Sequence, residues 1–351
     1  MIRKTLRQNN VILNNNICIK CGKCIDICPK DIFYKDRTEI ELNNVLECIG
    51  CLSCEKTCPV NAIKVYNRKI KKILIARKCN NSCRMCFEHD VNINSDFTTS
   101  ELLKEIDNTI DGNEEMIILS GAEITTRKDL FVLLERINEL NKNAEIFLPT
   151  NGRMFSYDHY LEKFLSLKLA NAKITISILG FKPETHDNIT QVEGSYEQAR
   201  KGILNLLNSE QNININFTVQ KSNYTEIPAM CKYYLDKGIK SIQLAIVEPT
   251  GRAENYFVNF IPKMSDLFPH LKKSLEYGNG KVRTKNIPKC ILKEFANYNF
   301  FPTLNNLKYK PEKCKNCIYD SECSGIWKKY IDIYGDSELI PIKNEDNCDL
   351  K

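Results

Sequence analysis

Between residues 70 and 260, short apolar runs alternate with longer stretches in which apolar residues recur every three or four positions. The short runs predict buried strands and the longer stretches predict amphipathic helices. The expected strands cover 71–76, 116–120, 144–150, 172–179, 212–219 and 239–247, and the expected helices between them cover 98–110, 128–140, 157–167, 196–208 and 227–238. If a turn at 248–251 (EPTG) follows the last strand, this alternation gives six strand-helix repeats, and it predicts a parallel sheet.

Strand-helix-strand crossovers are right-handed, so six repeats can curl into an open barrel that carries its chemistry at the carboxyl ends of the strands. The predicted fold is α/β, a partial (β/α)6 TIM-like barrel over residues 69–260. Residues 1–68 and 261–351 fall outside the pattern and are rich in cysteine. These two regions are predicted to form two small modules, the second of which is held together by its cysteines.

Composition narrows the possible functions. The chain has 351 residues with a net charge of +6, and its basic residues are scattered, so we expect no nucleic-acid partner. The longest purely apolar run, 130–134, is far shorter than a membrane span, and the N-terminus lacks a secretory apolar region. The 17 cysteines, mostly two or three residues apart, indicate metal ligands in a reducing cytoplasm rather than disulfides.

Eight cysteines near the N-terminus form two equal groups 30 residues apart, each followed by proline: Cys18, Cys21, Cys24 and Cys28, then Cys48, Cys51, Cys54 and Cys58. The repeated C-x2-C-x2-C-x3-C-P spacing resembles bacterial two-cluster ferredoxins. That resemblance implies crossed ligand sets, with Cys58 completing the first group's 4Fe-4S cluster and Cys28 completing the second. The alternative is a pair of zinc knuckles.

A third group, Cys79, Cys83 and Cys86, comes directly after the first barrel strand. C-x3-C-x2-C at this place in a six-fold strand-helix alternation resembles the radical S-adenosylmethionine (SAM) superfamily over about residues 70–260. Three thiolates ligate three irons of a 4Fe-4S cluster and leave the fourth iron open, as a catalytic metal requires. The resemblance implies that SAM binds this iron. Taken alone, the triplet also fits structural cysteines or part of a zinc site.

The resemblance extends to the ends of the other strands and implies further SAM contacts. The segment 120–123 resembles the family's Gly-Gly-Glu segment, with Glu123 as the anchor for the SAM amino group. The third, fourth and sixth strands offer contacts for the rest of SAM, and a thioether stands where many relatives have an aromatic residue before the third cysteine. The predicted SAM contacts are Met85, Gly121, Ala122, Glu123, Asn151, Ser177 and Val247.

The C-terminal cysteines Cys314, Cys317 and Cys323 resemble the shortened auxiliary-cluster module, called twitch or SPASM-like, of several radical SAM enzymes. The full module would place another cysteine where Trp327 stands, so we expect one auxiliary 4Fe-4S cluster. Its fourth ligand is Cys290 or Cys348, and the position of Cys290 before the group favours Cys290. Zinc is the alternative.

Four other residues are weaker candidates. His186 lies after the fourth strand, and Lys221 and Arg252 follow the fifth and sixth, where they can meet an anionic substrate or the SAM carboxylate. Polar residues are also ordinary in loops. Cys231, inside a predicted helix, is expected to be a buried apolar residue rather than a reactive thiol.

Together these features predict an enzyme with SAM and four 4Fe-4S clusters. An external donor such as flavodoxin, ferredoxin or a reductase would feed electrons through the N-terminal module to the Cys79 group. SAM would then be cleaved to a 5′-deoxyadenosyl radical that abstracts hydrogen from substrate. Relatives favour a peptide or protein side chain as substrate. The alternatives are a small molecule in cofactor biosynthesis, or a non-catalytic electron-transfer or sensing protein.

Overall fold

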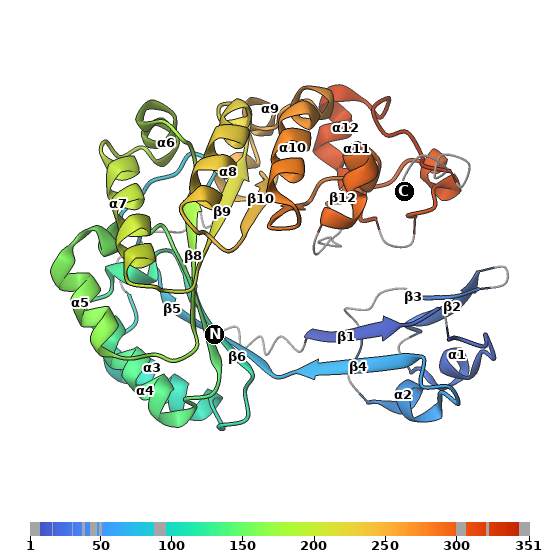
Figure 1. Cartoon of the computed structure of the whole chain (residues 1–351), viewed down its shortest axis with the longest axis horizontal. Coiled ribbons are helices and arrows are strands. Elements are labelled where there is room, and N and C mark those ends of the chain that lie inside the picture. The colour runs from blue at the N-terminus through green and yellow to red at the C-terminus, as the bar shows by residue number, and fades with distance from the viewer. Residues whose placement is uncertain are drawn as a thin grey trace.

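The computed structural model describes residues 8–15, 17–29, 31–36, 39–42, 48, 51–87, 96–299, 307–320 and 323–343. Figure 1 shows a small N-terminal unit, a curved sheet wrapped by helices, and a C-terminal segment beside the last strands of that sheet.

The N-terminal unit is built from two antiparallel strand pairs and two one-turn helices. Strand β1 pairs with β4 and β2 pairs with β3, while α1 packs against α2. The elements are β1 (Gln8–Leu13), α1 (Lys23–Ile27), β2 (Phe33–Asp36), β3 (Glu39–Leu42), α2 (Ser53–Thr57) and β4 (Ile63–Arg68).

The backbone repeats the duplication seen in the sequence. Helix α1 begins after Gly22 and α2 after Leu52, and both residues adopt left-handed conformations, with φ of 78° and 60°. Glycine takes such a φ without steric cost, whereas leucine does not. The Leu52 conformation is therefore held by the fold of its loop rather than by the residue's own preference.

The large domain is one seven-stranded parallel sheet in the order β11-β10-β9-β8-β7-β6-β5, open between its two edge strands. This confirms the predicted α/β fold. The strands are β5 (Ile70–Ala76), β6 (Met116–Gly121), β7 (Glu145–Thr150), β8 (Ala172–Ile178), β9 (Ile213–Val219), β10 (Ile242–Ile246) and β11 (Val282–Lys285).

Helices run along the outer side of the curved sheet (Figure 1). They are α3 (Thr99–Thr109), α4 (Leu130–Leu140), α5 (Asp158–Ser166), α6 (Pro183–Thr190), α7 (Ser195–Asn208), α8 (Ile227–Asp236) and α10 (Met264–Gly278). Short 3-10 turns follow four of the strands: η2 (Ile124–Thr126), η3 (Arg153–Ser156), η4 (Tyr224–Glu226) and η5 (Gly251–Ala253).

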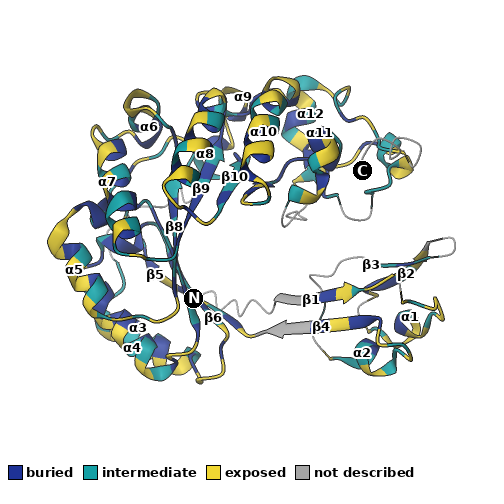
Figure 2. Ribbon diagram, viewed as in Figure 1, coloured by how far each residue is buried: buried dark blue, intermediate teal, exposed yellow. Residues whose placement is uncertain are grey.

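Strand residues alternate between the helical layer and the opposite face of the sheet. On β8, Ile174, Ile176 and Ile178 are fully buried in the main core, whereas Thr175 and Ser177 are only half-buried (Figure 2). Side chains alternate in this way along any strand, so the sequence pattern decides which face meets the helices. The polar face is the one that lies inside the curve of the sheet.

The sheet extends beyond residue 260, where the sequence analysis placed the end of the barrel. After α10, strand β11 pairs parallel with β10, as in Ile242 opposite Val282. This strand has only four residues, with the sequence VRTK, so it gives a weak hydrophobic signal in the sequence.

The remaining elements belong to the C-terminal segment. They are α9 (Phe257–Phe260), α11 (Lys289–Leu292), η6 (Lys293–Tyr298), β12 (Lys308–Tyr309), η7 (Glu312–Asn316), β13 (Ile326–Trp327) and α12 (Lys328–Tyr334). Trp327 and Tyr330 are fully buried in the main core, and the Met264 amide donates to Tyr330 Oη at 2.9 Å. The segment therefore shares the core of the barrel.

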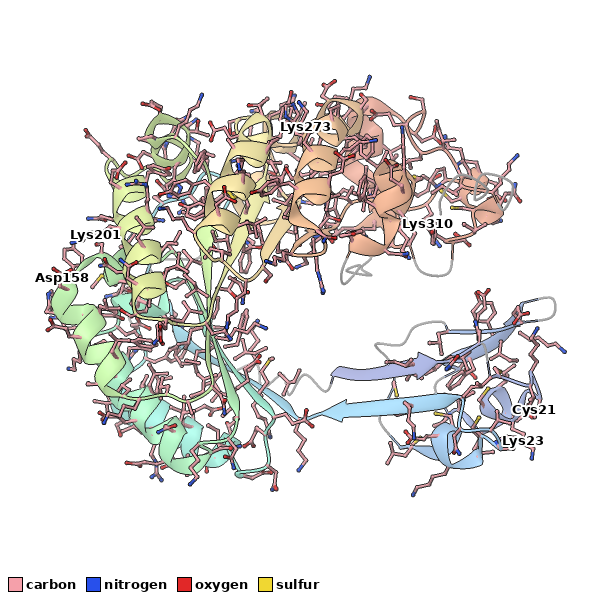
Figure 3. The ribbon with its side chains drawn as sticks, in the orientation of Figure 1. Cys21, Lys23, Asp158, Lys201, Lys273 and Lys310 are labelled. Atoms are coloured by element: carbon pink, nitrogen blue, oxygen red, sulfur yellow. The ribbon has the colours of Figure 1, made fainter. Side chains whose placement is uncertain are left out.

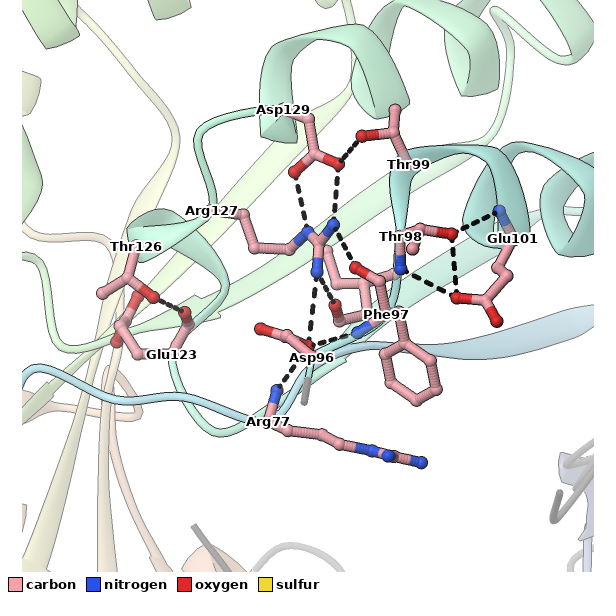
Figure 4. A network of polar contacts seen from close by, with 11 residues as sticks. Arg77, Asp96, Phe97, Thr98, Thr99, Glu101, Glu123, Thr126, Arg127 and Asp129 are labelled. Carbon is pink, nitrogen blue, oxygen red and sulfur yellow. Dashed lines mark hydrogen bonds and ion pairs between the residues drawn. The ribbon is translucent and has the colours of Figure 1, made fainter. Parts of the chain in front are cut away.

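A buried arginine fixes the end of β5 (Figure 4). Arg127 Nη2 lies 2.7 Å from Asp129 Oδ2, and Nη1 lies 3.3 Å from Asp96 Oδ1. The same guanidinium donates to the carbonyls of Ile75 at 3.0 Å and Phe97 at 3.1 Å. Because its donors are satisfied by charged and carbonyl partners, this buried charge joins β5 to the starts of α3 and α4.

Within the described residues, no helix combines the length and the apolar character that crossing a bilayer requires.

Candidate functional site: cysteine groups and the barrel mouth

The eight N-terminal cysteines line two separate hollows, each with three thiols from one group and one from the other. Cys58 joins Cys18, Cys21 and Cys24 in one hollow, and Cys28 joins Cys48, Cys51 and Cys54 in the other. The duplicated contacts orient the two exchanged thiols in the same way. The Ile32 amide donates to Cys28 Sγ at 3.4 Å, and the Ala62 amide donates to Cys58 Sγ at 3.2 Å.

The electrostatics of these hollows favour the binding of a positively charged group. Burial raises the pKa of Cys54 to about 11, and the neighbouring thiolates of Cys28, Cys48 and Cys51 add to the shift. Four thiolates close together in a partly buried site are stable only beside positive charge, which iron supplies. The donor set therefore fits a 4Fe-4S cluster in each hollow, and the individual ligand assignments stay predictions.

The third cysteine group occupies the loop that leaves β5 at the barrel mouth. Burial raises the pKa of Cys79 to about 11 and that of Cys83 to about 12, and Cys86 adds to both shifts. The Asn81 amide donates to Cys79 Sγ at 3.3 Å. Three half-buried thiols, two of them with raised pKa values, fit an iron cluster that would hold them as thiolates. We call residues 79–87 the cluster loop.

The end of β7 holds the cluster loop on one side. Asn151 Nδ2 donates to Asn80 Oδ1 at 2.6 Å, and Arg153 Nη1 donates to Asn81 Oδ1 at 2.6 Å and to the Asn80 carbonyl. Arg153 is buried, and its Nε donates to Gln198 Oε1 at 2.7 Å. A guanidinium donates in several fixed directions, so it can hold the loop and α7 at once.

Two further segments hold the loop on other sides. At the end of α6, the Ser82 and Arg84 amides donate to the carbonyls of Thr190 and Ile189 at 2.9 and 3.0 Å.

After β10, the Arg252 amide donates to the Cys86 carbonyl at 2.9 Å, and Arg252 Nη1 donates to the Cys83 carbonyl at 3.2 Å. At Gly251, φ is 57° and a Cβ would lie 2.4 Å from the Cys86 carbonyl oxygen. Only glycine allows this approach.

Glu123 lies behind the loop and is almost fully buried. Its Oε1 accepts from Thr150 Oγ1 at 2.6 Å and from Thr125 Oγ1 at 2.5 Å, and its Oε2 accepts from the Asn151 amide at 2.6 Å. Burial raises the pKa of this carboxyl, while the hydrogen bonds favour its charged form. The carboxylate thus joins the ends of β6 and β7, and its predicted contact with SAM stays a prediction.

The other predicted SAM contacts lie around the same mouth. At Gly121, φ is 139° and a Cβ would lie 2.2 Å from the Ala76 carbonyl oxygen, which accepts from the Ala122 amide at 3.0 Å. Val247 is buried, and its amide donates to the Val219 carbonyl at 3.0 Å.

Of the remaining two, Ser177 is half-buried on the polar face of β8, and Met85 packs partly buried against the main core.

The C-terminal cysteines gather in a third hollow. Cys290, Cys314, Cys317 and Cys323 line it together, and burial raises the pKa of Cys290 to about 12, with the other three thiolates adding to the shift. The arrangement supports Cys290 as the fourth thiol of the group. Cys348 lies outside the described residues. Trp327, at the position of the missing cysteine, is fully buried.

No three Cys, His, Asp or Glu side chains in the described ranges converge closely enough to hold a single metal ion.

The weaker candidates have structural contacts. His186 is buried, and its Nδ1 accepts from the Leu179 amide at 3.2 Å. Lys221 Nζ donates to the Val258 carbonyl at 3.0 Å, while Arg252 holds the cluster loop. Cys231 is fully buried, and burial raises its pKa to about 12, which confirms the expected apolar role.

Burial lowers the pKa of His186 to about 4, so the folded protein keeps this imidazole neutral where the unfolded chain, with a pKa of about 6.5, takes up a proton. Stability should therefore fall as the pH drops below 6.5. Between pH 7 and 5 the loss from this residue is about 2 kcal/mol. Anaerobic urea unfolding of wild type and His186→Asn across this range would measure it. Equal slopes for the two proteins would contradict the assignment.

Comparison with known proteins agrees with this geometry. Residues 73–233 match the family model of the radical SAM superfamily, and residues 10–59 match that of the 4Fe-4S dicluster domain. Residues 73–233 are therefore a radical SAM domain. The matched range of the radical SAM domain runs from β5 into α8 and includes the cluster loop, Glu123 and Arg153. SAM and 4Fe-4S clusters are the cofactors that these two matched domains imply.

Two curated relatives match about half of this chain. The AdoMet-dependent heme synthase of Methanosarcina barkeri is 29% identical over 159 residues, which are 45% of this chain and 44% of that protein. The pre-heme d1 synthase of Dinoroseobacter shibae is 26% identical over 180 residues, 51% of this chain and 43% of that protein. The chain thus spans less than half the length of either relative.

A solved structure shares the fold. Streptococcus suis SuiB bound to precursor peptide SuiA has a TM-score of 0.52 at 16% identity, and the alignment covers 76% of this chain and 60% of SuiB. At this identity the likeness concerns the fold alone.

Several residues that hold the cluster loop of this radical SAM domain escaped the sequence analysis, which named only Asn151 and Arg252, and those for other roles. Arg153, Thr190 and Gly251 follow three different strands and share no motif with the cysteines. The one available signal was position, since each lies shortly after a strand, where barrel sites form.

Proposed function

We propose that this chain is an enzyme that reductively cleaves SAM at the cluster loop and acts on a small molecule. The observation that carries the proposal is the loop itself. Three partly buried thiols lie on a loop that is held from three sides at the barrel mouth, beside the buried Glu123 carboxylate. A loop fixed in this way suits radical chemistry, in which the protein must hold the cofactor in a defined position.

Each residue has a stated role in this proposal. Cys79, Cys83 and Cys86 hold a 4Fe-4S cluster and leave one iron for SAM, and the predicted SAM contacts surround that position. When bound, the cluster supplies the electron that splits SAM into methionine and a 5′-deoxyadenosyl radical. Glu123 receives the SAM ammonium while its hydrogen bonds to Thr125 and Thr150 keep the carboxylate in place.

Electrons reach the cluster loop from the N-terminal domain. The two hollows support crossed ligation, with Cys18, Cys21, Cys24 and Cys58 around one cluster and Cys48, Cys51, Cys54 and Cys28 around the other. Ferredoxin-type centres carry single electrons at low potential, which suits this role. Flavodoxin, ferredoxin or a reductase is the external donor.

The C-terminal hollow holds an auxiliary 4Fe-4S cluster on Cys290, Cys314, Cys317 and Cys323. Support comes from the shared hollow and from the mutual effect of these thiols on the pKa of Cys290. Four clusters per chain follow, and a cluster on these four thiols would supply a substrate contact or an electron acceptor.

The relatives change our preferred substrate. The sequence analysis favoured a peptide, whereas the curated relatives are a heme synthase and a pre-heme d1 synthase. They favour a small molecule, and we adopt that alternative for this chain.

Anaerobic reconstitution with iron and sulfide, followed by SAM and dithionite, tests the activity. We expect 5′-deoxyadenosine and methionine in equal amounts, measured by liquid chromatography. A fully iron-loaded protein that forms neither product would instead support an electron-transfer or sensing role.

A further inference from the structure

A cavity of about 610 Å³ opens beside the cluster loop, in a place to which no role has yet been given. The ends of four segments line it: the loop itself, α6, the turn after β9, and the chain from η5 to α9. Its lining residues are Arg84, Asn188, Ile189, Gln220, Ser222, Arg252, Asn255, Tyr256, Asn259 and Phe260. None of these residues is a predicted SAM contact. The volume lies in the range of small-molecule sites, roughly 300–1,000 Å³.

The cavity has a positive lining. Arg84 and Arg252 contribute two charges, and no acidic side chain among the described residues lines it. Two acidic residues next to lining residues in sequence have other partners, since Asp187 accepts from the Ser195 hydroxyl and Glu254 pairs with Lys329. An anion entering here would meet two guanidinium groups, which is the arrangement that recognises carboxylates.

Gln220 supplies an independent sign of a ligand. The side chain is 1% exposed, and its Nε2 is buried without a hydrogen-bond acceptor among the described residues. Its backbone is fully used, because the amide donates to Asn223 Oδ1 and the carbonyl accepts from the Asn223 and Tyr224 amides. A buried, unsatisfied amide donor costs about 1–3 kcal/mol. A bound acceptor would remove that cost.

The rest of the lining suits a ligand with an apolar body. Ile189 and Phe260 lie in the wall, and Tyr256, which is 65% exposed, presents an aromatic ring at the opening. Aromatic side chains pack well against flat apolar groups. Arg252 also donates to the Cys83 carbonyl, so a ligand that contacts this arginine lies next to the cluster loop.

We propose that this cavity binds the substrate, a small molecule with an apolar body and carboxylate groups, of the tetrapyrrole kind. The proposal rests on the function proposed above, because it takes the reaction to be one on a small molecule. Arg84 and Arg252 bind its carboxylates, and Gln220 Nε2 donates to one of its oxygens. The proposal concerns binding, so it can be tested without turnover.

The test is an anaerobic titration of the full, iron-loaded protein with coproporphyrin III, a tetracarboxylate, in the absence of SAM and reductant. Binding is followed by the change in porphyrin absorbance and fluorescence. We expect saturable binding by wild type and about tenfold weaker binding by Arg84→Gln, the effect of losing about 1.4 kcal/mol. Arg136→Gln is the matched control, because Arg136 lies on α4 in an exposed pair with Asp107.

Gln220→Leu separates a ligand-binding role from a structural one. The change removes an unsatisfied buried donor at similar volume, so thermal stability should stay equal or rise. Porphyrin binding should nevertheless weaken several-fold. A loss of stability with unchanged binding would show that Gln220 serves the fold.

Three results would overturn the proposal: no saturable binding by wild type, wild-type affinity in both Arg84→Gln and Gln220→Leu, or equal affinity for the tetramethyl ester, which lacks the anionic groups. SAM cleavage by the wild-type protein is measured separately. Cleavage without porphyrin binding would leave the proposed radical SAM activity intact and reject this site. Binding without cleavage would support this binding site and reject the proposed radical SAM activity.

Discussion

Replacing Cys83 by alanine should abolish SAM cleavage. Two thiolates cannot hold the cluster of the radical SAM domain, and the alanine also opens a void in a site where burial is deep enough to raise the Cys83 pKa to about 12. Formation of 5′-deoxyadenosine should fall by about three orders of magnitude, to the level without enzyme. Iron content should drop by about four atoms per chain, because a cubane cluster carries four irons.

Cys231→Ala provides the matched control. Cys231 is more deeply buried than Cys83, its pKa is also raised to about 12, and it lies in α8 and lines none of the three cysteine hollows. This variant should lose about 1 kcal/mol of stability and keep its iron and activity. Retained cleavage by Cys83→Ala, or an equal loss of iron in both variants, would show that the cluster lies elsewhere.

Gly251→Ala should release the cluster loop. A Cβ at this position would lie 2.4 Å from the Cys86 carbonyl oxygen and 2.5 Å from Phe87 Cα, both backbone atoms that can move only if the loop moves. We expect a stability loss of about 3 kcal/mol, of which about 1 kcal/mol is the strain of alanine at a positive φ. The cluster on Cys79, Cys83 and Cys86 should be depleted, and SAM cleavage should fall with it.

Gly280→Ala carries the same backbone strain without the collision. Its φ is 83°, and an added Cβ would meet nothing within 4 Å. The difference between the two variants in urea unfolding and in the electron paramagnetic resonance signal of the reduced, SAM-bound cluster therefore measures the collision alone. If the two glycine variants behaved alike, Gly251 would have no special part in holding the loop.

The cysteine groups show how much local spacing can reveal. Cys28 and Cys58 are separated by 30 residues, yet the duplicated motif predicted their exchange between the two groups, and each thiol lies in the hollow of the other group. The C-terminal group likewise gathers with Cys290 as expected. Such sites can be predicted from sequence because cluster ligation needs several thiols from a short, tightly turned segment. The cysteines therefore recur at short, fixed spacings.

The surroundings of the cluster loop could not be read in this way. Arg153 reaches Asn81 across 72 residues of sequence, and Arg252 reaches Cys83 across 169. His186 was a weak candidate for substrate binding, and the structure shows it as a buried hydrogen-bond acceptor for the Leu179 amide. Single polar residues in loops carry no periodicity, so their partners depend on how the strands are placed side by side.

The sequence by itself determined the repeating strands of the barrel, the duplication of the N-terminal domain and the grouping of the cysteines, because periodic burial and cysteine motifs both impose fixed spacings. The tertiary structure alone decided the seventh strand β11, the three-sided support of the cluster loop and the arginine-lined cavity with its unsatisfied Gln220. These features arise where the ends of separate strands meet, and contacts between distant segments are set by packing rather than by any local pattern.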